Sequence, residues 1–227
     1  MRNSLLFLAI ILVLIASDSF AQTTAVDYYN RGVESHNQKD YDGAIANYSK
    51  AIELDANYWN AYYARSLSRL RKSDHDGVIA DSTKVIELNP SLSDAYNNRG
   101  YALEAKGEFA AAIPDFTKAL KLNPKFVDAY SNRCWARGET KDYNNAIDDC
   151  TKALELEPTH TAAYINRARA RYYNRNFEGA IADCTKAIEL SPKEPYLYEI
   201  RSITYRAVNK IDLAVADEKK AAQIKKP

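Results

Sequence analysis

The sequence predicts an all-α fold, a solenoid of six stacked helix–turn–helix units, from two observations. The first is a period of 34 residues that repeats without an insertion. The second is a pair of helix-type apolar patterns inside each period. Because each unit of such an array contacts only its neighbours, we expect stacked layers rather than one closed core. The repeated columns are tyrosine (Tyr28, Tyr62, Tyr96, Tyr130, Tyr164, Tyr198), arginine (Arg31, Arg65, Arg99, Arg133, Arg167, Arg201) and lysine (Lys50, Lys84, Lys118, Lys152, Lys186, Lys220).

Residues 93–126 illustrate one unit. Apolar and small residues from Tyr96 to Leu103 recur at the spacing of one helix face, and Gly107 interrupts this pattern. A second pattern of the same kind begins at Phe109. An Asn-Pro step near the end of the unit closes it, because the residue before a proline is steered away from helical backbone angles. Each unit is therefore expected to fold as two antiparallel helices.

On the spacing of its Tyr, Gly, Tyr or Phe, Ala, Ala and Pro positions, the sequence resembles tetratricopeptide repeat proteins. The family's usual tryptophan column is tyrosine here, and the leucine beside the glycine is arginine. The resemblance implies a right-handed superhelix whose first helices line a concave groove, and a non-enzymatic adaptor that binds peptides or partner proteins. The predicted units of the single array, residues 22–227, are 25–58, 59–92, 93–126, 127–160, 161–194 and 195–227.

The start of the chain has the features of a secretory signal. Arg2 supplies the charged start, an apolar run of twelve residues follows from Leu5 to Ala16, and Ser19-Phe20-Ala21 has the small-x-small cleavage pattern. An uncleaved anchor is the alternative, but twelve helical residues reach about 18 Å, short of a core of roughly 30 Å. We expect residues 1–21 to be cleaved and the exported chain to lie in the periplasm or outside the cell without a membrane span.

Charge and motifs exclude several classes of function. The chain has 31 basic and 30 acidic residues and a net charge of +1. Nucleic-acid binding needs a basic footprint, so we do not expect that partner. The three histidines are isolated, and no glycine-rich phosphate loop or catalytic constellation occurs. We expect no enzymatic activity, no metal and no cofactor.

The arginine column lies within the apolar stripe of each first helix, where a lone guanidinium would be costly to desolvate. An acidic column occurs on the second helices, with Asn47 in the first unit. We predict a structural ladder of arginine–aspartate pairs, and the sequence does not say which aspartate serves which arginine. Ligand binding by these arginines is the alternative. The ladder comprises Arg65, Arg99, Arg133 and Arg167 with Asp81, Asp115, Asp149 and Asp183.

The partner is expected in the groove, on the side of the first helices opposite their core stripe. Aromatic anchors dominate interfaces, and Trp135 and Tyr101 lie near the centre. The asparagines could bond an extended peptide backbone. The alternative is that some of the aromatics only pack against the next first helix. No lysine occupies the slots with which related repeats grip a terminal carboxylate. The candidates are Tyr29, Asn30, Tyr63, Leu67, Asn98, Tyr101, Asn132, Trp135, Asn166, Arg169 and Tyr172.

Three cysteines leave at least one unpaired. Cys150 and Cys184 occupy equivalent slots of stacked units, about 8–10 Å apart and beyond the roughly 7 Å limit for a disulfide. Cys134 with Cys150 is the only plausible pair. The favoured expectation is nevertheless three buried, inert thiols.

Two modes of action follow from the sequence. The first is a scaffold that binds a peptide or protein in its groove. The alternative is a structural subunit of an envelope complex, assembled through the convex face or the ends. The polar Glu218 and Lys219 on the last helix indicate that the array ends there without an extra helix.

Overall fold

The computed structural model describes residues 23–225, which form twelve α-helices in sequential antiparallel pairs. The expected signal segment, residues 1–21, lies outside the described residues. Within them no helix has both the length and the apolar composition that a membrane span requires. The first helices of the six repeats are α2 (Ala25–Asn37), α4 (Trp59–Arg71), α6 (Ser93–Ala105), α8 (Val127–Glu139), α10 (Thr161–Tyr173) and α12 (Pro195–Ala207). The second helices are α3 (Tyr41–Leu54), α5 (His75–Leu88), α7 (Phe109–Leu122), α9 (Tyr143–Leu156), α11 (Phe177–Leu190) and α13 (Ile211–Ile224).

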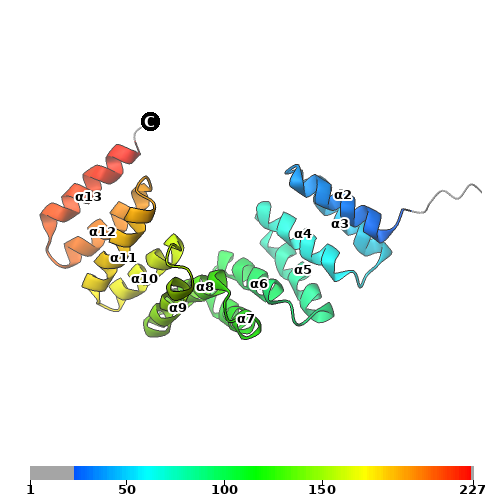
Figure 1. Ribbon diagram of the computed structural model, residues 1–227, viewed down its shortest axis with the longest axis horizontal. Helices are drawn as coiled ribbons and strands as arrows, with labels where there is room; N and C mark the ends of the chain where they lie inside the picture. Colours follow the sequence, from blue (N-terminus) through cyan, green and yellow to red (C-terminus); the bar gives the residue numbers. More distant parts are fainter. Residues whose placement is uncertain (1–22, 226–227) are drawn as a thin grey trace, which may run out of the picture.

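The pairs stack into an open arc, with the two ends of the described chain on opposite sides (Figure 1). Each helix packs against its neighbours in sequence, and the first helices also touch one another from α2 through α10. The first helices therefore form the inner layer of the arc and the second helices form the outer layer. The all-α solenoid expected from the 34-residue period is confirmed.

The turn inside every repeat uses a left-handed backbone position at the same place in the period. The residue has φ between 57° and 66° in five turns, and Gly107 has φ 78° in the third. In the first repeat Asp40 N–H donates back to the carbonyl of Ser35 and Lys39 N–H to that of His36, which closes the helix. Within residues 23–225, only the third of these turns uses the glycine that the conformation favours. The non-glycine residues are Lys39, Ser73, Lys141, Arg175 and Asn209.

The two helices of a repeat approach most closely at one pair of positions. A Cβ atom at Gly32 would lie 2.5 Å from the ring of Tyr48, and one at Gly100 would lie 2.8 Å from the ring of Phe116. In each of these pairs a residue without a side chain makes room for a large ring. The axes can therefore come together only where at least one partner is small.

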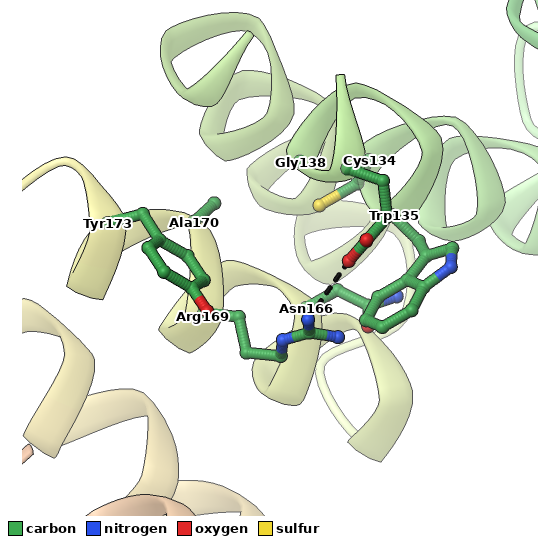
Figure 2. A pocket seen from close by; sticks show the side chains of 8 residues that line it. Cys134, Trp135, Gly138, Asn166, Arg169, Ala170 and Tyr173 are labelled. Atoms are coloured by element: carbon green, nitrogen blue, oxygen red, sulfur yellow. Dashed lines mark hydrogen bonds and ion pairs between the residues drawn. The ribbon is translucent and has the colours of Figure 1, made fainter. Parts of the chain in front are cut away.

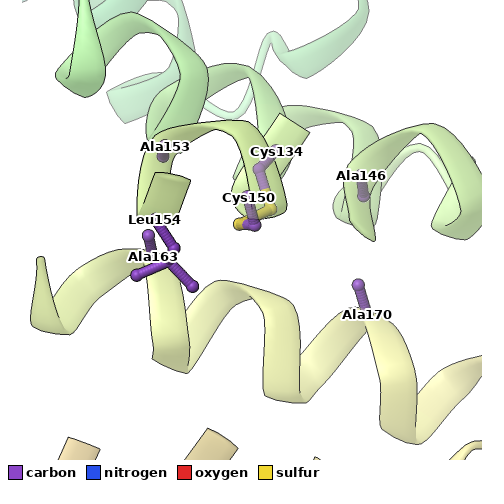
Figure 3. Close-up of a cluster of buried hydrophobic side chains, with 7 residues drawn as sticks. All are labelled: Cys134, Ala146, Cys150, Ala153, Leu154, Ala163 and Ala170. Atoms are coloured by element: carbon purple, nitrogen blue, oxygen red, sulfur yellow. A yellow bond between two sulfur atoms is a disulfide. The ribbon is translucent and has the colours of Figure 1, made fainter. Parts of the chain in front are cut away.

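In the fourth repeat the same two positions hold Cys134 and Cys150, which form a disulfide (Figure 3). Their Cα atoms are 5.5 Å apart, within the range that a disulfide spans. The expectation of three free thiols is therefore wrong for these two, because close helix approach brings the sulfur atoms together. Cys184 stays free, and burial raises the pKa of its thiol to about 12, which makes it inert.

The last repeat differs at the corresponding contact. Glu218 stands opposite Ser202, accepts its hydroxyl at 2.9 Å, and also accepts two hydrogen bonds from Arg206. A charged residue stands where the other repeats have an aromatic ring, a cysteine or, in the second repeat, Ser82. Ile211 and Leu213 of α13 are nevertheless 43% and 48% exposed, so this end of the array is not wholly polar.

Candidate functional site

From the second to the sixth repeat, the arginine column lies between the two helices of the repeat, whereas Arg31 of the first repeat is exposed. In the third repeat Arg99 Nε and Nη2 donate to the two carboxylate oxygens of Asp115, both at 2.7 Å. The partner is always the aspartate 16 residues later, in the same repeat, which settles the pairing that the sequence left open. The five pairs are Arg65–Asp81, Arg99–Asp115, Arg133–Asp149, Arg167–Asp183 and Arg201–Asp217.

The remaining guanidinium nitrogen of each arginine links one repeat to the one before it. Arg99 Nη1 donates to the hydroxyl of Thr83 at 3.2 Å, and Arg133 Nη1 donates to that of Thr117 at 3.0 Å. The arginine thus joins its own second helix to the preceding second helix. Equivalent hydroxyls accept from the other three arginines; they belong to Ser49, Thr151 and Thr185.

Three of the aspartates accept from a second arginine one turn further along the first helix. Arg137 Nη1 donates to Asp149 at 2.6 Å, and Arg171 Nη1 donates to Asp183 at 2.7 Å. Arg69 does the same to Asp81. The ladder carboxylates are buried and hydrogen-bonded on both oxygens. Their acceptor capacity is used within the scaffold, so the ladder offers little to a ligand.

The concave face, defined here as the exposed side of the first helices, carries the large side chains that the scaffold does not bury. Five of these side chains are between 44% and 55% exposed. One lies on α2, and the other four lie on α6, α10 and α12. The residues are Val26, Tyr101, Tyr173, Tyr196 and Ile203.

An apolar hollow lies between α2 and α4 at the N-terminal end of this face. It has a volume of about 190 Å³ and is lined by Tyr29, Val33, Tyr63 and Leu67, among others. Tyr29 is only half-buried, although its ring packs 5.7 Å from that of Tyr48. A neighbouring hollow of about 310 Å³ runs from Leu67 to Tyr101. This end of the face therefore offers apolar surface to a partner.

The centre of the face is closed over Trp135. The guanidinium carbon of Arg169 lies 4.0 Å from the indole centroid, and Arg169 Nη2 donates to Glu139 at 2.9 Å (Figure 2). The space left there is about 10 Å³, enough for one water molecule. Trp135 was expected to be one of the best anchors, but Arg169 from the next repeat already covers its ring.

Two of the predicted groove asparagines join neighbouring first helices. Asn132 Nδ2 donates to Asn97 Oδ1 at 3.2 Å, and Asn166 Nδ2 donates to the carbonyl of Ser131 at 3.2 Å. Their amide donors are therefore committed between repeats. Asn98 Nδ2 is buried and has no hydrogen-bond partner among the described residues, whereas Asn30 is exposed.

A second apolar hollow lies between α10 and α12. It has a volume of about 220 Å³, and its walls include Tyr172, Tyr173, Tyr196, Ile200 and Ile203. The ring of Tyr172 meets that of Tyr173 edge-on, with centroids 5.4 Å apart. This hollow combines exposed aromatic and aliphatic side chains, which are typical of the anchor sites of protein interfaces.

The sequence analysis missed Glu104 on α6. Burial raises the pKa of its carboxyl to about 7, and the charge of Glu139 adds to the shift. Glu104 Oε2 is buried and accepts no hydrogen bond from the described residues. Aligning the repeats would have pointed to Glu104, because it is a charged residue at a slot that holds the uncharged Leu70 and Gly138 in the adjacent repeats. No group of three or more potential metal ligands occurs within residues 23–225.

Two models of the tetratricopeptide repeat match the chain. One matches residues 25–58, 93–126 and 127–160, and the other matches residues 161–194. Together these stretches make up more than half of the sequence. A comparison with curated protein sequences found no significant match to the chain.

Solved structures share the fold at low identity. MamA is 24% identical with a TM-score of 0.69, over 75% of this chain and 93% of MamA. YrrB, described as a TPR protein with an unusual peptide-binding site, is 21% identical with a TM-score of 0.67, over 87% and 93%. PilF of Pseudomonas aeruginosa is 15% identical with a TM-score of 0.73, over 88% and 91%. At these identities the likeness extends to the fold alone.

Proposed function

Because the chain belongs to the tetratricopeptide repeat family, we propose that it is a protein-binding scaffold that holds a segment of a partner polypeptide along its concave face. In this proposal the chain performs no covalent chemistry. The peptide-binding site described for YrrB, a protein of the same fold, supports this mode. The arginine ladder provides the rigid frame, and the variable side chains of the first helices provide specificity.

The observation that carries the proposal is the pair of apolar hollows at the two ends of the concave face. They measure about 190 Å³ and 220 Å³. Half-buried tyrosine side chains line the first, and exposed tyrosine and isoleucine side chains line the second. Solvent-exposed aromatic surface is costly in water unless a partner covers it. A segment with apolar side chains at both ends would bury these residues.

The test uses peptides selected from a random display library on the purified chain of residues 22–227. Isothermal titration then compares the wild type with Tyr173→Ala and Tyr101→Ala. We expect each variant to weaken the selected peptides at least tenfold while the melting temperature stays close to that of the wild type. The matched control is Leu213→Ala, which removes an equally exposed apolar side chain at the C-terminal end. Loss of binding in the control but not in the concave variants would contradict the proposal.

A second candidate is assembly through the C-terminal end, favoured by the exposure of Ile211 and Leu213 on α13. Sedimentation of the chain across a concentration series tests this candidate. It predicts a self-associating species that Leu213→Lys converts to a monomer. A wild type that stays monomeric, together with concave-face binding, would favour the groove mode alone.

We also propose that the chain is exported. The signal-like pattern of residues 1–21 supports this, and so does the Cys134–Cys150 disulfide, because disulfides persist in oxidising compartments. Mass spectrometry of the chain recovered from fractionated cells should find an N-terminus at Gln22 in the periplasmic or secreted fraction. A chain that retains Met1 in the cytosolic fraction would contradict export.

A further inference from the structure

The centre of the concave face differs in charge from its two ends. Along α6 and α8, the stripe of residues that contains Tyr101 and Trp135 carries four carboxylates and neither lysine nor arginine. The cations that border this stripe are Arg71 of α4, which lines the hollow beside Tyr101, and Arg169 of α10, which lies over Trp135. Two of these carboxylates are satisfied by the chain itself. Asp128 accepts from His160 at 3.2 Å, and Glu139 accepts from Arg169 at 2.9 Å.

The other two carboxylates, Asp94 and Glu104, have no cationic partner among the described residues. Asp94 accepts only from the hydroxyl of Ser93, at 3.0 Å. Glu104 forms no ion pair within residues 23–225, and its Oε2 atom is buried without a hydrogen bond. A partly buried carboxylate without a donor is unfavourable, so a cation brought to this place gains more than one brought to open surface.

The neighbouring repeat shows what such a cation would contact. In α8 the ring of Trp135 and the carboxylate of Glu139, four residues later, together hold the guanidinium of Arg169. In α6 the ring of Tyr101 and the carboxylate of Glu104, three residues later, recur on the same helix face. The repeat that follows α6 presents Trp135 at the slot of Arg169 instead of a cation.

We propose that this centre binds a lysine or arginine side chain of a partner polypeptide, between the ring of Tyr101 and the carboxylate of Glu104. This inference rests on the proposed function and names the chemistry of the partner: a cationic residue in the middle and apolar residues toward both ends. The ring face of a tyrosine attracts a cation, and Glu104 supplies the charge-assisted hydrogen bond. Asp94, on the same stripe, adds to the negative potential.

The spacing of the array sets the length of a probe. Four steps of roughly 10 Å separate the hollow at α2 and α4 from the hollow at α10 and α12. At about 3.3 Å per extended residue, this span corresponds to about 12 residues. A suitable probe is an acetylated and amidated thirteen-residue peptide with Tyr-Ile at each end, a central lysine, and glycine and serine between. The matched probe has norleucine, which has no charge, in place of the lysine.

Isothermal titration measures the affinity of both probes for the wild type, Glu104→Gln and Glu87→Gln. We expect the wild type to bind the lysine probe at least tenfold more tightly than the norleucine probe. Glu104→Gln should lower that ratio below threefold. Glu87 is an exposed glutamate on α5 that pairs with Lys84, so Glu87→Gln removes the same charge without changing the ratio. Asp94→Asn should lower the ratio less than Glu104→Gln does.

A further variant separates failure of this inference from failure of the proposed function. Tyr173→Ala should weaken both probes equally, because it acts on the hollow between α10 and α12. Equal affinity of the wild type for the two probes, with both weakened by Tyr173→Ala, would overturn the cation site and leave groove binding intact. Absence of binding by either probe at 1 mM would overturn both.

Discussion

The interior of the helical pairs and the concave face differ in what repeats. The arginine–aspartate contact recurs from the second to the sixth repeat through the same atoms, with distances between 2.6 and 3.0 Å. On the concave face, one slot on successive first helices changes completely. Its occupants are Val33, Leu67, Tyr101, Trp135, Arg169 and Ile203. The comparison shows that stacking constrains the interior, where every repeat must meet its neighbours in the same way, whereas the inner surface is free to vary.

The first prediction breaks the interior pattern and has the largest expected effect. Arg99→Met leaves Asp115 buried without its guanidinium, which should lower the free energy of unfolding by about 3–5 kcal/mol. Arg31→Met is the matched control, because Arg31 is exposed and Asn47 stands in its own repeat at the position that holds the aspartate elsewhere. The control should change stability by less than about 0.5 kcal/mol. Urea titrations check both, and an Arg99→Met chain as stable as the wild type would refute the structural role of the ladder.

The second prediction concerns the only repeat whose closest helix contact is covalent. Replacing Cys134 and Cys150 by alanine should lower the free energy of unfolding by about 3 kcal/mol. The disulfide joins residues 16 positions apart, and closing a loop of this length reduces the entropy of the unfolded chain by an amount of that order. Thermal unfolding with and without a reductant provides the measurement. Reductant should lower the melting temperature of the wild type and not that of the double variant. A titration that finds three free thiols in the unreduced, denatured chain would exclude the bond.

The third prediction tests the concave centre through pH. The pKa of Glu104 is raised from 4.5 to about 7, which means that the folded state favours the protonated form of its carboxyl. The stability that this group contributes is fully present below pH 4.5 and is lost as the pH rises through 7. Glu104→Gln should therefore match the wild type at pH 4.5 and exceed its free energy of unfolding at pH 8 by up to about 3 kcal/mol. Equal stability of the two chains at both pH values would show that Glu104 is not desolvated.

The last prediction has the smallest expected effect and concerns a residue of the concave face rather than of the interior. Tyr101→Ala removes a side chain that is 44% exposed and contributes little to the stacking of repeats. Its free energy of unfolding should stay within about 0.5 kcal/mol of the wild type. Differential scanning calorimetry measures this directly. A loss of more than 2 kcal/mol would mean that Tyr101 belongs to the scaffold rather than to the binding surface.

Most of the fold was predictable because it depends on local patterns. Residues such as Tyr96 and Leu103 recur at helical spacing, and the strict period places equivalent residues at equivalent points of a stack. The candidate site was less predictable. Nothing in the sequence indicated that Arg169 would close over Trp135, since the two residues are 34 positions apart on different helices. The charge of Glu104 was visible, but its burial depends on neighbouring repeats.

The sequence by itself determined the all-α class and the columns of interior residues, because helical spacing and the period are properties of the chain order. Only the tertiary structure decided which aspartate meets each arginine and that Cys134 meets Cys150. The structure also showed that Glu104 lies desolvated beside Glu139. These contacts join residues on different helices, and their distances depend on how closely and at what angle the helices pack.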